Sequence, residues 1–284
     1  MNVLVFGRTG QVASELARIA PEARFVGREE ADLAQPAACA RLIAESGAKI
    51  VINAAAYTAV DRAESEEDIA TLINGAAPSA MAAAARRIGA AFVHISTDYV
   101  FDGSGKTPWP ADAPVGPISA YGRSKLAGED GVRAAGGAYA ILRTSWVFSA
   151  HGSNFLKTML RLAGTHETLR VVADQVGGPT PASDLARAVL EIGRQLVAHP
   201  ELSGTYHFSA APDVSWADFA RKIFAQAGCP TTVTDIATAD YPTPARRPMN
   251  SRLDCSRTET VFGLQRPDWK YGITKILKEM DAMR

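Results

Sequence analysis

The sequence has few cysteines, few aromatic residues and no excess of charge of either sign. Its 284 residues include three cysteines, Cys39, Cys229 and Cys255, which are too widely separated for a disulfide framework or a paired metal-ligand spacing. This usage fits a reducing cytoplasm. The 30 basic side chains are balanced by 30 acidic ones, so the electrostatic footprint of a nucleic-acid-binding protein is absent. We therefore expect no nucleic-acid partner.

Long apolar runs are also missing. The most apolar later stretch, residues 76–95, is mostly alanine and contains Arg86, Arg87 and His94, which makes it too weak for a membrane span. The first six residues are expected to form a strand, without the basic segment and cleavage site of a secretory signal. With 47% hydrophobic residues, the chain can still bury a large core. These features predict a soluble, cytoplasmic protein with no membrane partner.

What the sequence does contain is a regular alternation in its first half. Short β-branched or aromatic runs predict strands, and alanine-rich stretches between them predict helices. The expected strands are Asn2–Phe6, Arg24–Val26, Lys49–Ile52, Ala91–Ile95 and Tyr139–Leu142, and the expected helices are Gln11–Ile19, Pro36–Glu45, Glu67–Arg87 and Ser119–Arg133. Strands that are apolar throughout indicate a parallel sheet covered on both faces. Right-handed crossovers then give an α/β, doubly wound Rossmann-like fold.

A glycine-rich turn follows the first strand directly. Residues 7–13 (GRTGQVA) open a helix, so the glycines let the backbone approach a pyrophosphate that the free helix amides then bind. Ala13 stands where a third glycine is common, and it is small enough for close packing of the helix on the strand. The alternative is an ordinary strand-to-helix turn. The position of the segment between a strand and a helix favours a dinucleotide.

The second strand ends next to Arg28, at a place where an acid would favour NAD. The guanidinium of Arg28, helped by Arg8 in the glycine turn, suits the 2′-phosphate of NADPH. Both arginines could instead be solvated surface charges, and Glu29 and Glu30 could still bind the ribose of NADH. We expect NADPH as the cofactor, with NADH as the alternative.

After about residue 149 the alternation fades and loops rich in proline and glycine appear. Helices are expected over Ala182–Ala198, Trp216–Ala227 and Thr274–Met283, with a strand at Thr205–Phe208 and Ser215 as an N-cap. We interpret residues 1–149 as a dinucleotide-binding domain to which some later segments return. Residues 150–284 are expected to form mainly a smaller, interleaved, C-terminal substrate-binding lobe.

A tyrosine and a lysine stand four residues apart on the expected helix Ser119–Arg133. Tyr121 and Lys125 then share one helix face, about 6 Å apart at Cβ. A lysine ammonium can stabilise the phenolate of a tyrosine, whose pKa is otherwise about 10, although such pairs are also common on exposed helix surfaces. Thr97 favours the catalytic interpretation, because it ends the fourth strand at the edge where ligands bind. Its hydroxyl can hydrogen-bond a substrate carbonyl that Tyr121 protonates.

This combination resembles the extended short-chain dehydrogenases/reductases, whose catalytic set is Ser or Thr, Tyr and Lys. Segments that resemble the dTDP-4-dehydrorhamnose reductase branch of this family are residues 53–61 (NAAAYTAVD), 94–101 (HISTDYVF), 143–148 (RTSWVF) and 247–251 (RPMNS). Ala13 and Tyr57 depart from that branch, in which glycine is usual at the first position and histidine or a similar ring is expected at the second. The nucleotide-sugar 4,6-dehydratases would carry Thr-Asp-Glu where this chain has Thr97, Asp98 and Tyr99, so the acid for water elimination is missing.

The resemblance implies NADPH-dependent reduction of the 4-keto group of a nucleotide-linked 6-deoxyhexulose, giving dTDP-L-rhamnose. Together with the motifs above, it assigns catalysis to Thr97, Tyr121 and Lys125. It assigns cofactor binding to Gly7, Gly10, Gln11, Val12, Arg28, Asp32, Leu33, Ala56, Tyr57, Thr58, Tyr121 and Lys125, and sugar contacts to Thr97, Asp98 and Trp146. It further implies a homodimer and, in some members, a Mg²⁺ ion at acidic residues for which the sequence indicates no site.

Several residues keep a second interpretation. Arg247, before Pro248, can contact two phosphate oxygens of a nucleotide diphosphate, or it can form a surface salt bridge. Trp146 suits sugar stacking or an ordinary core. The five histidines lack the spacing of a zinc site, so no catalytic metal is expected, and His94 is expected to be a buried core residue. The alternative function is a non-catalytic, NADP-binding regulatory subunit like that of methionine adenosyltransferase.

Overall fold

A six-stranded parallel sheet forms the centre of the molecule. The computed structural model describes residues 2–282. The strands of this sheet are β1 (Val3–Phe6), β2 (Arg24–Val26), β3 (Ile50–Asn53), β4 (Ala91–Thr97), β5 (Tyr139–Thr144) and β10 (Gly204–His207). They pair in parallel in the order β10-β5-β4-β3-β1-β2. The strand order reverses between β1 and β3, as in a doubly wound sheet, which confirms the predicted α/β Rossmann-like fold.

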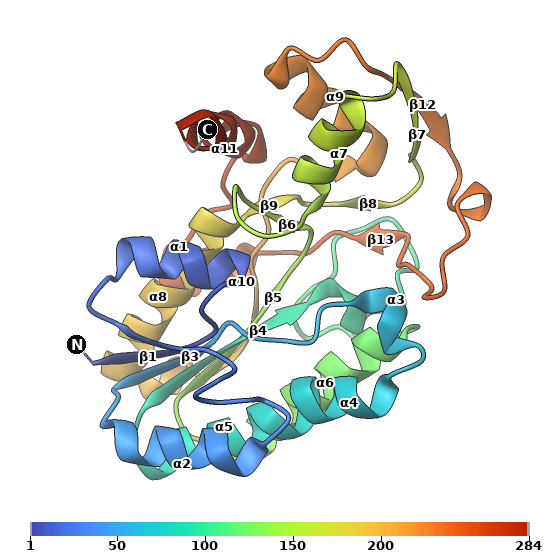
Figure 1. The fold of residues 1–284 in the computed structure, drawn as a ribbon. Helices are drawn as coiled ribbons and strands as arrows, with labels where there is room; N and C mark the ends of the chain where they lie inside the picture. Colours follow the sequence, from blue (N-terminus) through green and yellow to red (C-terminus); the bar gives the residue numbers. More distant parts are fainter. Residues whose placement is uncertain (1, 283–284) are drawn as a thin grey trace.

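Helices cover both faces of this sheet (Figure 1). On one face lie α1 (Gln11–Ile19) and α8 (Ala182–Ala198), and on the other lie α2 (Pro36–Ser46), α5 (Ala77–Arg87) and α6 (Ala120–Ala135). The strands alternate between the two cores: Val5 packs with Leu16 and Leu185, whereas Phe6 packs with Ile43 and Met81. Each fully buried apolar side chain stabilises the fold by about 1.5–3 kcal/mol. Packing on both faces of the sheet therefore stabilises the layered arrangement of helices around it.

The long helical stretch predicted over residues 67–87 contains a wide turn. It consists of α4 (Glu67–Thr71), the π-helical segment η1 (Leu72–Ala76) and α5, and the short helix α3 (Val60–Ala63) precedes it. A π turn inserts one extra residue into a helix and is frequent at functional sites. Asn74 and Gly75 lie buried in this turn, next to α6.

The second half of the chain builds a smaller lobe and also returns to the sheet. The lobe contains α7 (Phe155–Ala163), β7 (Thr168–Val172), α9 (Trp216–Ala227), β12 (Thr232–Ile236) and α11 (Trp269–Ala282), around an apolar cluster of its own. The returning elements are α8, which packs against the sheet, and β10, which pairs with β5. Ser215 caps α9 as predicted, because its hydroxyl accepts from the Asp218 amide at 3.0 Å. The division at residue 149 stays a prediction.

Some predicted elements differ from those observed. The terminal helix was expected over Thr274–Met283 but begins at Trp269, because the buried indole of Trp269 anchors an additional first turn; Met283 lies outside the described residues. The prediction also omitted the helices α3, α7 and α10 (Ser256–Phe262) and the five-residue strands β7 and β12. It further omitted the two-residue strands β6 (Val147–Phe148), β8 (Val176–Gly177), β9 (Thr180–Pro181), β11 (Val214–Ser215) and β13 (Asn250–Ser251). Strands of two residues are too short to show any periodicity.

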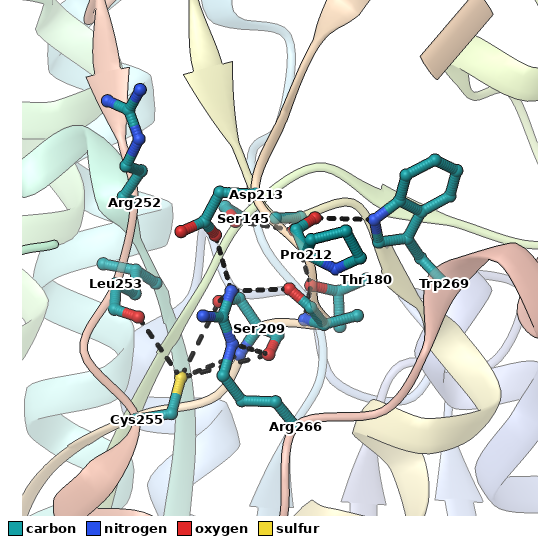
Figure 2. A network of polar contacts seen from close by, with 12 residues as sticks. Ser145, Thr180, Ser209, Pro212, Asp213, Arg252, Leu253, Cys255, Arg266 and Trp269 are labelled. Atoms are coloured by element: carbon teal, nitrogen blue, oxygen red, sulfur yellow. Dashed lines mark hydrogen bonds and ion pairs between the residues drawn. The ribbon is translucent and has the colours of Figure 1, made fainter. Parts of the chain in front are cut away.

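A polar cluster joins the end of β10 to the start of α11 (Figure 2). The Arg266 guanidinium donates to the carbonyl oxygens of Ser209 (3.0 Å) and Ala210 (2.7 Å) and pairs with Asp213 (2.5 Å). The indole of Trp269 donates to the Pro212 carbonyl at 2.6 Å. These bonds fix the loop through which the chain leaves the central sheet.

No helix among residues 2–282 combines the length and the apolar character needed to cross a bilayer.

Candidate active site

Thr97, Tyr121 and Lys125 all lie near the carboxyl end of β4. Thr97 is the last residue of β4, and the other two lie in the first two turns of α6. Gly122 permits the close approach of α6, because a Cβ there would lie 2.2 Å from the carbonyl oxygen of Tyr99 in η2 (Asp98–Val100). The Tyr121 phenol lies within hydrogen-bonding reach of the Thr97 hydroxyl. A proton donor and a second hydroxyl therefore converge on one point.

Lys125 is buried and held from two sides. Its Nζ donates to the carbonyl oxygen of Ile95 at 2.7 Å and lies 3.3 Å from Nε2 of His94. Burial lowers the pKa of Lys125 to about 8, and the nearby carboxylate of Glu129 opposes this shift. The ammonium can therefore lose its proton close to physiological pH.

Burial also controls Tyr121 and Asp98. Burial and the charge of Asp98 raise the pKa of Tyr121, and the Thr97 hydroxyl opposes the shift. The raised pKa keeps the phenol protonated and able to donate, and the lowering expected from Lys125 is not observed. Burial likewise raises the pKa of Asp98 to about 6, although the hydroxyls of Ser251 and Thr97 oppose it. Oδ1 of Asp98 accepts from Thr97 at 3.0 Å, whereas Oδ2 is buried with no hydrogen-bond partner among residues 2–282.

The glycine turn fits a pyrophosphate. Gly7 has a φ of +118°, which side chains other than glycine rarely adopt, and a Cβ there would lie 3.3 Å from the backbone of Ala54 and 3.4 Å from Cβ of Ala13. Gly10 caps α1 without any side-chain hydrogen bond, so the first amides of the helix stay free for an anion. Ala13 is buried, as its packing role predicts.

The residues after β2 are joined by exposed ion pairs. Nε of Arg28 lies 3.1 Å from Oδ2 of Asp32, and Nη1 of Arg8 lies 2.8 Å from Oε1 of Glu29. The Arg28 side chain is 80% exposed. Such pairs contribute at most about 1 kcal/mol, so either arginine can exchange its partner for a phosphate. Leu33 is buried beneath this loop.

Asn74 was not singled out by the sequence, although it fixes the loop that contains Ala56, Tyr57 and Thr58. Its Oδ1 accepts from the Tyr57 amide at 2.8 Å, and its Nδ2 donates to the Tyr57 carbonyl oxygen at 2.9 Å and to Oγ of Ser124 at 3.0 Å. The Tyr57 phenol donates to Glu66 at 2.6 Å. An asparagine inside an apolar helix was the one available signal in the sequence.

Trp146 lies between β5 and β6 in a conformation unusual for a large side chain, with a φ of +50°. Its ring stacks on Trp216 with 3.5 Å between centroids and an angle of 11°. The Trp216 indole in turn donates to Oε1 of Gln175 at 3.2 Å. Trp146 is half-buried, and a Cβ on Gly177 would lie 3.0 Å from its ring.

Arg247 lies in a cleft of about 660 Å³ that is lined by Asp102, Ile118, Thr238, Tyr241, Arg246, Arg247 and Met249, among others. Its Nη2 pairs with Oδ2 of Asp61 at 2.8 Å, which is the salt bridge that the sequence offered as one interpretation. Its Nη1 is buried without a hydrogen-bond partner among residues 2–282. An unpartnered guanidinium nitrogen in a cleft can accept an anionic ligand.

A buried ionic network underlies the site, and the sequence analysis did not identify it. Glu129, one turn after Lys125 on α6, pairs through Oε2 with Nη2 of Arg143 at 2.6 Å and with Arg133 at 2.5 Å. Its Oε1 accepts from Ser96 at 2.7 Å. These bonds join α6 to β4 and β5. They therefore hold the helix that presents Tyr121 and Lys125.

A cluster of two glutamates and one histidine lies away from the candidate catalytic residues. Ligand atoms of Glu15, His151 and Glu279 lie within 4.8 Å of one another. Glu15 already pairs with Arg18 at 2.8 Å. Since such clusters are common without an ion, this one alone indicates no metal site.

Comparison with known proteins agrees with this geometry. The family model described as "RmlD substrate binding domain" matches residues 1–282. The dTDP-4-dehydrorhamnose reductase of Sinorhizobium fredii is 44% identical over 98% of this chain and 97% of its own length, and that of Escherichia coli K12 is 41% identical over 99% and 98%.

Solved structures lead to the same conclusion. A dTDP-4-dehydrorhamnose reductase from Clostridium acetobutylicum has a TM-score of 0.92 and 38% identity, covering 99% of this chain and all of its own. That of Bacillus anthracis, in complex with NADP, has a TM-score of 0.91 and 35% identity, covering 98% and 100%. The chain belongs to the dTDP-4-dehydrorhamnose reductase family.

Proposed function

We propose that the protein reduces the 4-keto group of dTDP-4-dehydro-6-deoxy-L-mannose (dTDP-4-dehydro-L-rhamnose) to dTDP-L-rhamnose with NADPH, in the biosynthesis of cell-surface polysaccharide. The observation that carries the proposal is the convergence of buried Thr97, half-buried Tyr121 and buried Lys125 at the strand edge that also holds the glycine turn. The names of the relatives support the same activity.

When bound, the nicotinamide of NADPH would supply a hydride to C4. Tyr121 donates its proton to the developing alkoxide oxygen, and Thr97 hydrogen-bonds the same oxygen. The ammonium of Lys125 stabilises the phenolate that Tyr121 becomes. Lys125 and Asp98 are only 2% exposed and Thr97 6%, so little water reaches these side chains, whereas Tyr121 is half-buried.

The cofactor would lie across the glycine turn. Gly7, Gly10, Gln11 and Val12 bind the pyrophosphate, and Arg28 binds the 2′-phosphate. Asp32 and Leu33 lie at the adenine, and Ala56, Tyr57 and Thr58 line the remaining length toward Tyr121 and Lys125. The NADP complex of the Bacillus anthracis relative supports this choice of cofactor, and Mg²⁺ is not part of the proposal.

Arg28→Ala tests the choice between NADPH and NADH. We expect the variant to lose affinity for NADPH about tenfold or more and to keep its affinity for NADH, because only NADPH loses a charge-assisted bond of about 1.5–3 kcal/mol. Fluorescence titration with both cofactors measures the difference. Arg24→Ala is the control, since Arg24 is also exposed on β2 but pairs with Glu30. An equal loss for both cofactors would remove Arg28 from the 2′-phosphate site.

The sugar nucleotide would bind between the two lobes. Thr97 and Asp98 contact the sugar, Trp146 stacks on it, and Arg247 binds the diphosphate. The unpartnered oxygen of Asp98 and the unpartnered nitrogen of Arg247 support these roles, because each leaves one buried polar atom free for a ligand.

Arg247→Ala tests the diphosphate contact. We expect the KM for the sugar nucleotide to rise about tenfold or more, with kcat and NADPH affinity near the parent values, because a bond to a non-reacting group is removed. Steady-state kinetics measure the split. In Asp61→Asn the arginine remains while its partner loses charge, so KM should stay close to that of the parent. An unchanged KM in Arg247→Ala would place this residue outside the site.

The alternative, a non-catalytic NADP-binding regulatory subunit, would retain the fold without turnover. The decisive experiment is NADPH oxidation by the purified protein with the 4-keto sugar nucleotide, followed at 340 nm. Tight NADPH binding without oxidation would favour the alternative.

On the family resemblance we further propose a cytoplasmic homodimer, which light scattering during size-exclusion chromatography tests.

A further inference from the structure

His94 lies between two buried polar side chains. On β4, its Nδ1 is 3.1 Å from Nδ2 of Asn53 on β3, and its Nε2 is 3.3 Å from Nζ of Lys125 on α6. All three residues are at most 2% exposed. Burial and the neighbouring Lys125 hold the pKa of His94 well below its usual range. The imidazole is therefore neutral and carries a single N–H.

Asn53 determines which ring nitrogen carries that hydrogen. The Asn53 carbonyl oxygen Oδ1 accepts from the amide of Ala55 at 3.2 Å, so its NH₂ group is turned toward His94. An NH₂ group can only donate, and Nδ1 must therefore accept. The remaining hydrogen of a neutral ring then lies on Nε2, which faces Lys125.

This tautomer distinguishes between the two forms of Lys125. A neutral amine has a lone pair that accepts from Nε2–H, while one N–H donates to Ile95 and the other stays free for a ligand. An ammonium has no lone pair, so its third N–H would oppose Nε2–H. Moving the ring hydrogen to Nδ1 would relieve this conflict only by opposing the Asn53 NH₂ group. When Lys125 is charged, the three side chains of Asn53, His94 and Lys125 therefore form one hydrogen bond fewer than when it is neutral.

We propose that Asn53 and His94 are positioning residues that stabilise the neutral amine of Lys125 and so set the pH at which its ammonium is lost. This inference rests on the proposed function, in which that ammonium stands beside Tyr121. The network thereby limits reduction at alkaline pH, and it provides a stable uncharged lysine whenever a proton leaves the site. Burial lowers the pKa of Lys125 and so acts in the same direction as the proposed hydrogen bond from His94.

Other charges around Lys125 do not replace this effect. Ionisable side chains on the elements packed around α6 include Asp61 and Arg62 of α3, Glu64 directly after it, Glu67 and Asp68 of α4, Arg86 and Arg87 of α5, Asp98 and Tyr99 of η2 and Arg143 of β5, besides Tyr121 and Glu129 of α6 itself. Of these, Glu129 acts on Lys125, and its charge raises the pKa. The charge of Glu129 therefore opposes the lowering of the Lys125 pKa that we propose for His94.

Two substitutions of Asn53 test the proposal. In Asn53→Ala nothing donates to Nδ1 of His94, so the ring hydrogen can lie on either nitrogen. In Asn53→Asp the carboxylate accepts Nδ1–H, which moves the hydrogen to Nδ1 and leaves Nε2 as an acceptor for the ammonium. We expect the pKa of Lys125 to rise by about 0.5–1 unit in Asn53→Ala and by at least about one unit in Asn53→Asp. A titration of ¹³Cε-labelled lysine with NADP⁺ bound measures it, with Lys125→Arg assigning the signal.

Nitrogen NMR of labelled histidine provides the second measurement. The His94 hydrogen should lie on Nε2 in the parent and on Nδ1 in Asn53→Asp. The control is His207→Phe, since His207 is equally buried on β10 but contacts Arg143 at 3.4 Å, and the pKa of Lys125 should stay unchanged there. The alkaline limb of the pH–kcat profile should move upward in the order parent, Asn53→Ala, Asn53→Asp.

Outcomes separate this inference from the proposed activity. An unchanged or lower pKa of Lys125 in folded Asn53→Ala and Asn53→Asp overturns the inference, whatever the enzyme does. A parent protein that shows the expected tautomer and pKa order, yet never oxidises NADPH with the keto sugar, overturns the proposed function and leaves the role of Asn53 and His94 supported. If Asn53→Asp fails to fold, the uncharged Asn53→Ala still decides.

Discussion

Replacing Tyr121 by phenylalanine should reduce kcat by about a hundredfold to ten-thousandfold. The substitution removes one oxygen and keeps the ring, so the fold and NADPH binding should survive while the proton donor is lost. General acid catalysis typically contributes a factor of this size. Because burial keeps the pKa of Tyr121 high, the parent holds the donating form across the usable pH range. Stopped-flow measurement of NADPH oxidation checks the loss of kcat, and a cofactor titration checks that NADPH binding is retained.

Two further variants sharpen this result. Thr97→Val should slow the same step, and the double variant should lose less than the product of the two single effects, because both hydroxyls hold one oxygen. Tyr99→Phe is the matched control: its ring lies edge-on to Tyr121 with centroids 5.5 Å apart, and removing its hydroxyl should change kcat less than tenfold. A Tyr121→Phe variant as fast as the parent would refute the mechanism.

Replacing Glu129 by glutamine should lower the free energy of unfolding by about 3–5 kcal/mol at pH 7. The Arg143 side chain is 2% exposed, and the substitution leaves its guanidinium buried without a charged partner. Urea unfolding measures the loss. Asp130→Asn is the matched control, because Asp130 is the next residue on α6 and pairs with the same Arg133, but it is 66% exposed. Its effect should stay below about 1 kcal/mol.

The effect of Glu129→Gln should depend on pH in a defined direction. Burial alone would raise the pKa of Glu129, but the hydrogen bonds and charge of Arg143, with Ser96 and Arg133, lower it overall. A carboxylate with a lowered pKa contributes stability above its unfolded pKa and loses it as the pH falls through the folded value. The difference between parent and variant should therefore narrow in acid. A difference that stays constant down to acid pH would show that the charge of Glu129 is not what stabilises this network.

Much of the fold follows from local sequence signals. The helices Gln11–Ile19, Ala182–Ala198 and Trp216–Ala227 have the predicted bounds, because periodicity and caps depend on residues within a few positions of each other. The glycine turn after β1 and the spacing of Tyr121 and Lys125 are local in the same sense. A helix places positions i and i+4 on one face, so this pair required no tertiary information.

Contacts between distant segments were decided by tertiary packing alone. Lys125 meets His94 and Arg143 meets Glu129 because α6 packs across β4 and β5, and no local pattern encodes which strand a helix covers. The return of β10 to the sheet and the stacking of Trp146 on Trp216 depend on the same long-range closure. Burial, which determines the pKa values of Tyr121 and Lys125, exists only once these segments have met. The sequence thus determined which chemical groups are present, and the packing determined the environment that controls their protonation.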